Sequence, residues 1–122
     1  MFGSVAFTAK RHSTMKRRRQ LFEEAGEIIE REYAETLSLD DVARRVASSR
    51  RQLQRAFLEA GETSFREYLG RVRMARARKL LREGALPVSR VAAAVGYRRP
   101  AQFAKAFRRH HGAPPSAYRQ AA

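Results

Sequence analysis

Apolar residues recur along most of the chain at intervals of three and four, the spacing that places side chains on one face of an α-helix. Residues 20–34 show the pattern first, with Leu21, Phe22, Ala25, Ile28, Ile29 and Tyr33 at apolar positions. Glutamates occupy the positions between them, namely Glu23, Glu24, Glu27 and Glu30. The segment is therefore predicted to be an amphipathic helix that packs on the core and exposes an acidic face.

The same pattern of apolar positions then occurs twice. Residues 37–46 match residues 86–95 at an offset of 49, and residues 53–57 match residues 103–107 at an offset of 50. Each copy has the form of a short helix, a tight turn and a second helix. We therefore predict an all-α fold of two helix-turn-helix subdomains joined by a long linker helix.

Capping and turn residues set the predicted boundaries. Ser38 has the form of a helix N-cap, Gly61 is expected to end the second helix, and Ser64 to Glu67 resembles a capping box that opens the linker. The predicted division is a disordered basic arm over residues 1–19, subdomains over 20–63 and 84–122, and a linker helix over 64–83. A solvated tail without function is the alternative for the arm.

The charge of the chain indicates its class of partner. A formal net charge of +14 and a pI near 11.5 favour a polyanion, either nucleic acid or an anionic membrane surface. Membrane is the weaker alternative, because no apolar run approaches the roughly 20 residues that span a bilayer. We expect a cytoplasmic protein.

Residue types that support catalysis or metal binding are scarce. The chain has no cysteine, and its three histidines are His12, His110 and His111. Adjacent histidines on a helix point to different sides, which disfavours a shared metal ion. No nucleophile with a nearby base and no glycine-rich phosphate loop is present. We expect no enzymatic activity, no cofactor and no metal site.

The second helix of the first unit carries the strongest candidate contacts to DNA bases. Leu53, Ala56 and Phe57 lie on one face, and the other face carries Arg51, Gln54, Arg55 and Leu58. Arginine donates two hydrogen bonds to guanine, and glutamine bonds adenine in the same fashion. An ordinary solvated helix face is the alternative.

The corresponding helix of the second unit offers fewer polar groups. Its candidate base-contacting residues are Ala101, Gln102, Ala104 and Lys105. The alanines are suited to a thymine methyl group rather than to hydrogen bonds. The expected phosphate contacts come from Arg17, Arg50, Arg99 and Arg108.

Several motifs together resemble the DNA-binding domain of the AraC/XylS family of bacterial transcription regulators. The sharpest match is the run Ala92-Ala93-Ala94-Val95-Gly96-Tyr97, followed by Phe103, Phe107-Arg108, Gly112, Pro115 and Tyr118-Arg119. Residues 39–57 match the first helix-turn-helix unit of the family pattern, and the apolar positions of the predicted linker match the family's connecting helix. Pro114 and Pro87 depart from the family pattern, because polar caps are usual there.

The resemblance implies two recognition helices that enter successive major grooves, about 34 Å or 10 base pairs apart. It places base contacts at Arg51, Gln54 and Arg55, and in the second unit at Pro100, Ala101, Gln102, Ala104 and Lys105. Two recognition helices in one chain would let a monomer bind an asymmetric site of double-stranded DNA. We expect the short, stand-alone subtype without a small-molecule ligand. Activation, with RNA polymerase as a further partner, and repression both remain open.

Two alternatives belong to other functional classes. A nonspecific nucleoid or RNA-binding protein would use the same charge without sequence preference, and its affinity would fall with salt on every sequence. An interaction or enzyme-accessory module would not bind DNA at all.

Overall fold

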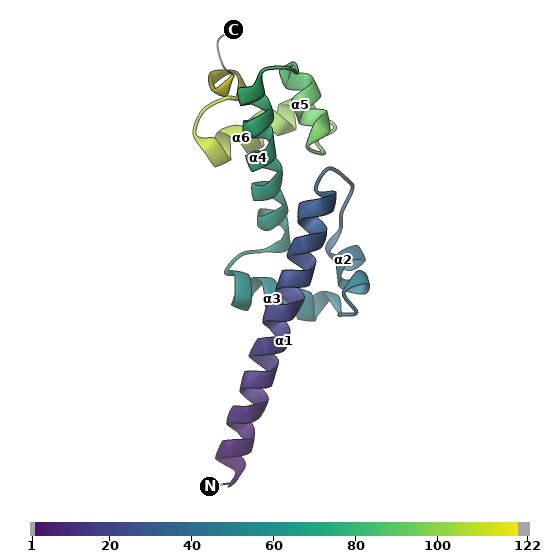
Figure 1. Ribbon diagram of the computed structural model, residues 1–122, viewed down its shortest axis with the longest axis vertical. Helices are drawn as coiled ribbons and strands as arrows, with labels where there is room; N and C mark the ends of the chain where they lie inside the picture. The colour runs from purple at the N-terminus through teal and green to yellow at the C-terminus, as the bar shows by residue number, and fades with distance from the viewer. Residues whose placement is uncertain (1, 120–122) are drawn as a thin grey trace. The chain divides into compact units, whose positions relative to one another are not determined.

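The protein is helical throughout its regular structure. The computed structural model describes the backbone of residues 2–119 and the side chains of residues 13–119, and within these residues it contains helices and no strand (Figure 1). The elements are α1 (Phe2–Glu32), α2 (Leu39–Arg45), α3 (Arg50–Gly61), α4 (Phe65–Glu83), α5 (Val88–Ala94), α6 (Pro100–His111) and the 3₁₀ helix η1 (Pro115–Tyr118). The predicted all-α class is confirmed.

The chain forms two compact units. The first combines the chain up to Ile28 with residues 37–65, and the second combines residues 29–36 with the chain from Arg66 onward. Each unit contains one helix-turn-helix pair, α2 with α3 in the first and α5 with α6 in the second. This division differs from the predicted one, because α4 after Phe65 and the last turn of α1 belong to the second unit instead of forming a separate linker.

The duplication extends to the backbone hydrogen bonds of the two turns. In the first turn, Ala47 N donates to Arg44 O and Ser48 N to Ala43 O, at 3.1 and 2.8 Å. The second turn repeats both bonds 49 residues later, at 3.1 and 2.9 Å. Ala47 and its counterpart Gly96 both have positive φ, at 55° and 96°. The offset increases by one after the turn, so the inserted residue lies in the loop before α6.

Each unit has a core built from the predicted apolar positions. Buried residues of the first unit are Leu21, Ala25, Ile28, Val42, Ala43, Val46, Leu53, Ala56 and Phe57. The second core consists of Met74, Ala77, Leu81, Val91, Ala92, Val95, Phe103 and Phe107. Tyr118 packs edge-on against Phe107 at 5.3 Å between ring centroids, which holds η1 against the core of the second unit.

The apolar stripe of α4 differs from the prediction. An apolar stripe that continues from Leu69 and Val72 is predicted to pass through Ala75 or Arg76, but both of these residues are exposed. Met74, Ala77 and Leu81 are buried instead. Leu69 and Val72 are also buried, so the buried residues of α4 follow one another at intervals of two to four residues and cover more than one narrow stripe of the helix.

Helix α1 begins much earlier than the sequence analysis predicts. It runs from Phe2, whereas a disordered arm was expected over residues 1–19. Lysine, arginine and alanine, which are frequent in this segment, are good helix formers. Once residues after Gln20 are held by the core, each preceding residue extends an existing helix without a new nucleation step. High charge therefore did not prevent helix formation here.

The end of α3 corrects another expectation. Gly61 was expected to end the helix, but it is the last helical residue, and Glu62 takes the left-handed cap at φ 51°. Glu62 is thus the counterpart of Gly112, which caps α6 at φ 79°. Gly61 is required for a different reason: a Cβ atom there would lie 2.4 Å from Cε1 of Phe22. The glycine makes room for a ring that packs on Phe57.

Candidate nucleic-acid interface

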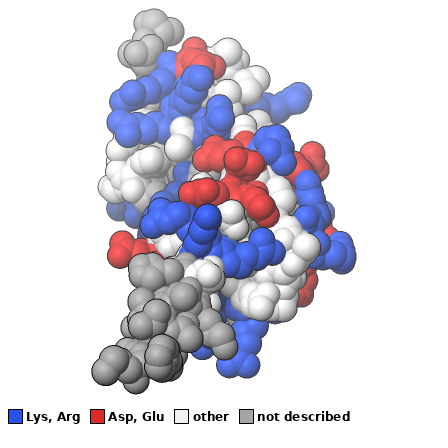
Figure 2. Space-filling model, turned by 60° about the horizontal axis from the view of Figure 1, so that its bottom comes forward, with Lys and Arg blue, Asp and Glu red and all other residues white. Residues whose placement is uncertain are grey.

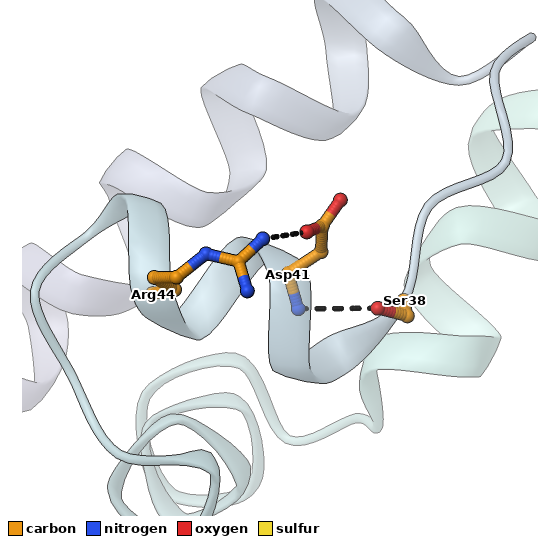
Figure 3. Close-up of polar contacts among 3 residues, drawn as sticks. All are labelled: Ser38, Asp41 and Arg44. Atoms are coloured by element: carbon orange, nitrogen blue, oxygen red, sulfur yellow. Dashed lines mark hydrogen bonds and ion pairs between the residues drawn. The ribbon is translucent and has the colours of Figure 1, made fainter.

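Serine caps fix the start of both helices in the first helix-turn-helix pair. Ser38 Oγ accepts a hydrogen bond from Asp41 N at 3.1 Å, and Asp41 in turn pairs with Arg44 on the same helix (Figure 3). Ser49 Oγ accepts from Gln52 N at 3.1 Å and caps α3. Each such cap is worth about 1 kcal/mol. The first turn of α3, which carries candidate base contacts, is therefore held in place by its own N-cap.

The two faces of α3 differ sharply in exposure. Leu53, Ala56 and Phe57 are 0% exposed and anchor the helix to the core. On the opposite face Arg51, Gln54 and Arg55 are all exposed, which agrees with the predicted position of their side chains. Leu58 follows them on this face and is 66% exposed. The helix thus offers polar donors and one apolar side chain to a partner.

Arg50 is placed differently from the other arginines of α3. Its guanidinium forms an ion pair with Asp40 of α2, at 3.0 Å from Nη1 to Oδ2. Both side chains are more than half exposed, so the pair is screened by water and contributes about 1 kcal/mol or less. Arg50 can exchange this carboxylate for a phosphate at little cost.

A groove lies between α1 and the beginning of α3, within the first unit. Its volume is about 550 Å³. Residues of both helices line it: Ser13, Thr14, Arg17, Arg18, Leu21, Ser49, Arg51, Gln52 and Arg55. Arg18 is paired with Glu59 of α3, and this contact ties the two walls together. Three predicted site residues therefore meet here: Arg17 from α1, and Arg51 and Arg55 from α3.

The sequence analysis did not assign five polar residues of this lining to a site: Ser13, Thr14, Arg18, Ser49 and Gln52. The α1 members recur at helical spacing with Arg17 and Leu21, which would have shown them on one face of a helix if the segment had been taken as helical. Gln52 lies beside Arg51 but on the flank of α3, away from Gln54. Only the packing of α1 against α3 makes that flank part of a groove.

Helix α6 of the second unit starts without a side-chain cap. Its N-cap is Arg99, which makes no side-chain capping hydrogen bond, and Pro100 occupies the first turn. The preceding helix α5 also lacks a side-chain cap at Pro87, as the sequence analysis expected. Of the predicted contact residues, Ala104 is half-buried and the others are exposed: Arg99, Ala101, Gln102, Lys105 and Arg108. The second unit thus presents a less polar surface than α3.

Arg73 supports the second unit in a way that the sequence analysis missed. Its Nε donates to the carbonyl of Tyr33 at 2.7 Å and its Nη2 to that of Glu35 at 3.0 Å. The guanidinium also lies over the ring of Tyr97, 5.6 Å from its centroid, beside the turn at Gly96. Burial lowers the pKa of Arg73, and Tyr97 opposes the shift. Arg73 therefore joins the segment after α1 to the helix-turn-helix turn.

Charge is distributed unevenly over the surface. Figure 2 shows a face on which acidic side chains form a group bordered by lysine and arginine side chains. Within the described part of the chain, no three histidine, aspartate or glutamate side chains are grouped so that they could hold a metal ion. None of the helices described has the length and apolar character needed to cross a membrane.

Two helix-turn-helix pairs, each with an anchored and an exposed recognition helix, define the class of protein: a helix-turn-helix domain protein. Residues 42–121 match the family described as a helix-turn-helix domain. A transcriptional regulator with an AraC-type DNA-binding domain from Chromobacterium violaceum is similar in structure. Its TM-score is 0.78 at 32% identity, over 82% of this chain and 89% of that one. The chain belongs to the AraC-type family of helix-turn-helix transcriptional regulators.

Two further relatives bear on function. The DNA-binding domain of AdpA, a global transcriptional factor solved in complex with a target DNA, matches with a TM-score of 0.72 and 30% identity, over 80% of this chain and 87% of that one. The Msm operon regulatory protein of Streptococcus mutans is 32% identical over 93 residues, which are 76% of this chain and 34% of that protein. The chain thus spans about a third of the length of this curated relative.

Proposed function

We propose that this protein is a sequence-specific regulator of transcription that inserts α3 and α6 into successive major grooves of double-stranded DNA. The observation that carries the proposal is the exposed, polar face of α3, whose opposite face is completely buried. The repeated turn geometry gives α6 the same relation to its own unit. The similar DNA-binding domain of AdpA, which was solved in complex with a target DNA, supports double-stranded DNA as the partner.

The two recognition helices have unequal roles in this proposal. Arg51, Gln54 and Arg55 make most of the hydrogen bonds to bases, because arginine and glutamine are bidentate donors in the major groove. In the second unit the base contacts come from Ala101, Gln102, Ala104 and Lys105. Arg17, Arg50, Arg99 and Arg108 bind phosphates, which position the protein without specifying sequence.

One chain with two recognition helices binds as a monomer to an asymmetric site. As a regulator of bacterial type it acts on chromosomal DNA in the cytoplasm. If it activates transcription, RNA polymerase is its second partner.

Selection of binding sites from a randomised duplex pool, at near-physiological salt, tests the proposal directly. We expect an asymmetric motif with two blocks of conserved bases about one helical turn apart. The block bound by α3 should be the more strongly conserved. A pool in which no sequence is enriched would overturn sequence-specific binding.

A pair of variants on one helix then tests the assignment of base contacts. Arg55→Ala should weaken binding to the selected site by about 1 to 3 kcal/mol and relax preference at one base position, and Arg51→Ala should behave similarly. Arg50→Ala is the matched control, because it should weaken selected and random duplexes alike. Equal losses of affinity for Arg55→Ala on both duplexes would refute a base contact by Arg55.

A nonspecific nucleoid or nucleic-acid-binding protein is the second candidate, and the net charge of +14 favours it. Such a protein would show affinity that falls steeply with salt but barely changes with sequence. Measuring the salt dependence on the selected duplex and on a scrambled duplex of equal length distinguishes the two functions.

A further inference from the structure

The groove between α1 and α3 has a wall of fixed geometry. Ser13, Thr14, Arg17 and Leu21 line it from α1. Arg17 comes four residues after Ser13 and three after Thr14, and Leu21 comes four residues after Arg17, so these side chains share one side of the helix. Arg18 of the same wall pairs with Glu59 of α3. The side chains of α1 therefore reach the groove from set positions and not from a freely moving arm.

The chemistry of the groove is that of a site for phosphate groups. Three of its four arginines, Arg17, Arg51 and Arg55, have no acidic partner within ion-pair distance among the described residues. A hydroxyl and an amide group stand beside them, on Ser13 and Gln52. Guanidinium groups that converge without carboxylates repel one another, and a bound anion removes this repulsion. Bidentate hydrogen bonding makes arginine well suited to phosphate.

The position of the groove indicates which phosphates it would bind. Arg51 and Arg55 line it and also belong to the exposed face of α3 that carries Gln54. A helix in the major groove has a sugar-phosphate strand along each of its edges. The α1 wall stands next to α3 at one of these edges. A small free anion would compete with DNA for Arg51 and Arg55. A DNA strand does not face this competition, because the binding of α3 in the major groove already brings the strand to the groove between α1 and α3.

We propose that this groove binds phosphates of the DNA strand that borders the site of α3. Arg17 makes the main contact, and Ser13 and Gln52 add donors. The proposal rests on the proposed function and adds a defined role for α1. In this role α1 contacts DNA at positions that are fixed relative to α3. The bound phosphates are then the same ones in every complex with a given site.

The test compares two arginines of α1 in the full chain. Arg17→Gln removes a groove arginine, and Arg19→Gln is the matched control, because Arg19 is also exposed and carries the same charge but does not line the groove. Binding is measured at several salt concentrations on the duplex selected by the wild type. Ethylation interference on the same duplex maps the phosphates that are contacted. Circular dichroism and thermal melting confirm that both variants are folded.

We expect Arg17→Gln to bind about tenfold more weakly and to lower the slope of log K against log salt by about 0.9, the value for one phosphate contact. Interference should disappear at one or two phosphates beside the block bound by α3. Arg19→Gln should leave the slope and the interference pattern close to those of the wild type.

Equal effects of Arg17→Gln and Arg19→Gln would show diffuse attraction and overturn the proposal. So would an unchanged interference pattern in Arg17→Gln. If Arg55→Ala still relaxes base preference in either case, the proposed function stands and only the groove site fails. If the wild type selects no sequence from the randomised pool, the proposed function fails and this inference falls with it.

Discussion

Replacing Gly61 with alanine should destabilise the first unit, although alanine is the better helix former. Alanine loses less backbone entropy than glycine when the chain folds, and in a helix interior this difference stabilises the protein by at most about 1 kcal/mol. It also adds a Cβ atom 2.4 Å from Cε1 and 2.6 Å from Cζ of Phe22. Phe22 packs edge-on against the fully buried ring of Phe57, at 5.2 Å between centroids, so it cannot move further inward.

Overpacking of this kind typically costs about 1 to 3 kcal/mol. The higher helix propensity of alanine offsets part of this cost. The expected net loss of stability is about 1 kcal/mol, or a fall of roughly 4 °C in Tm. Thermal melting followed by circular dichroism at 222 nm measures the change. In a Phe22→Ala background the ring is absent, so the loss caused by Gly61→Ala should vanish in a double-mutant cycle.

Gly70 provides the matched control, because it also lies within a helix. A Cβ atom there would meet Nε2 of His110 at 3.4 Å, an ordinary contact with an exposed side chain. Gly70→Ala should therefore raise the stability by up to about 1 kcal/mol. A Gly61→Ala variant that melts at or above the wild-type temperature would refute the packing argument.

Two further predictions concern the second unit. Arg73→Lys should lower the free energy of unfolding by about 1 to 3 kcal/mol in urea titrations, because an ammonium group cannot reach both the Tyr33 and Glu35 carbonyls in the geometry of the guanidinium; an unchanged urea midpoint would contradict this. For His110, burial and then Arg109, His111 and Arg71 lower the pKa in the folded protein, against an opposing effect of Glu67. The unfolded chain therefore binds the proton more tightly, and stability should decline as the pH falls below about 6.5 towards the lowered folded pKa. His110→Gln should flatten this part of the Tm profile, and an equally steep profile in the variant would show that another group is responsible.

Local periodicity was sufficient for the architecture of this protein. Apolar positions at intervals of three and four predicted an all-helical fold with two helix-turn-helix units. The repeat of this pattern predicted that the two units are copies of each other. Ser38 acts through atoms only three residues away, so its role as an N-cap could be predicted without knowledge of tertiary packing. The buried face of α3 follows for the same reason, since the helical period alone separates Leu53 and Phe57 from Arg51 and Arg55.

Features that depend on distant partners could not be predicted in this way. The helical state of residues 2–19 was missed because charge and weak periodicity favoured disorder, whereas the anchored end of α1 supports extension of the helix. The sequence predicts that Gly61 ends α3, whereas its actual role depends on the ring of Phe22, 39 residues away. The role of Arg73 could not be predicted from local sequence, since its carbonyl partners lie 40 and 38 residues earlier in the chain.

The sequence by itself determined the all-helical class of the protein, its repeated helix-turn-helix units and most of the residues exposed on each recognition helix, because these follow from interactions within one or two helical turns. Only the tertiary structure decided that α1 packs beside α3 to form a groove, that Arg18 joins the two helices through Glu59, and that Arg73 holds the turn at Gly96. Contacts between residues about 40 positions apart arise from the packing of helices against a shared core, and the period of an isolated helix carries no information about them.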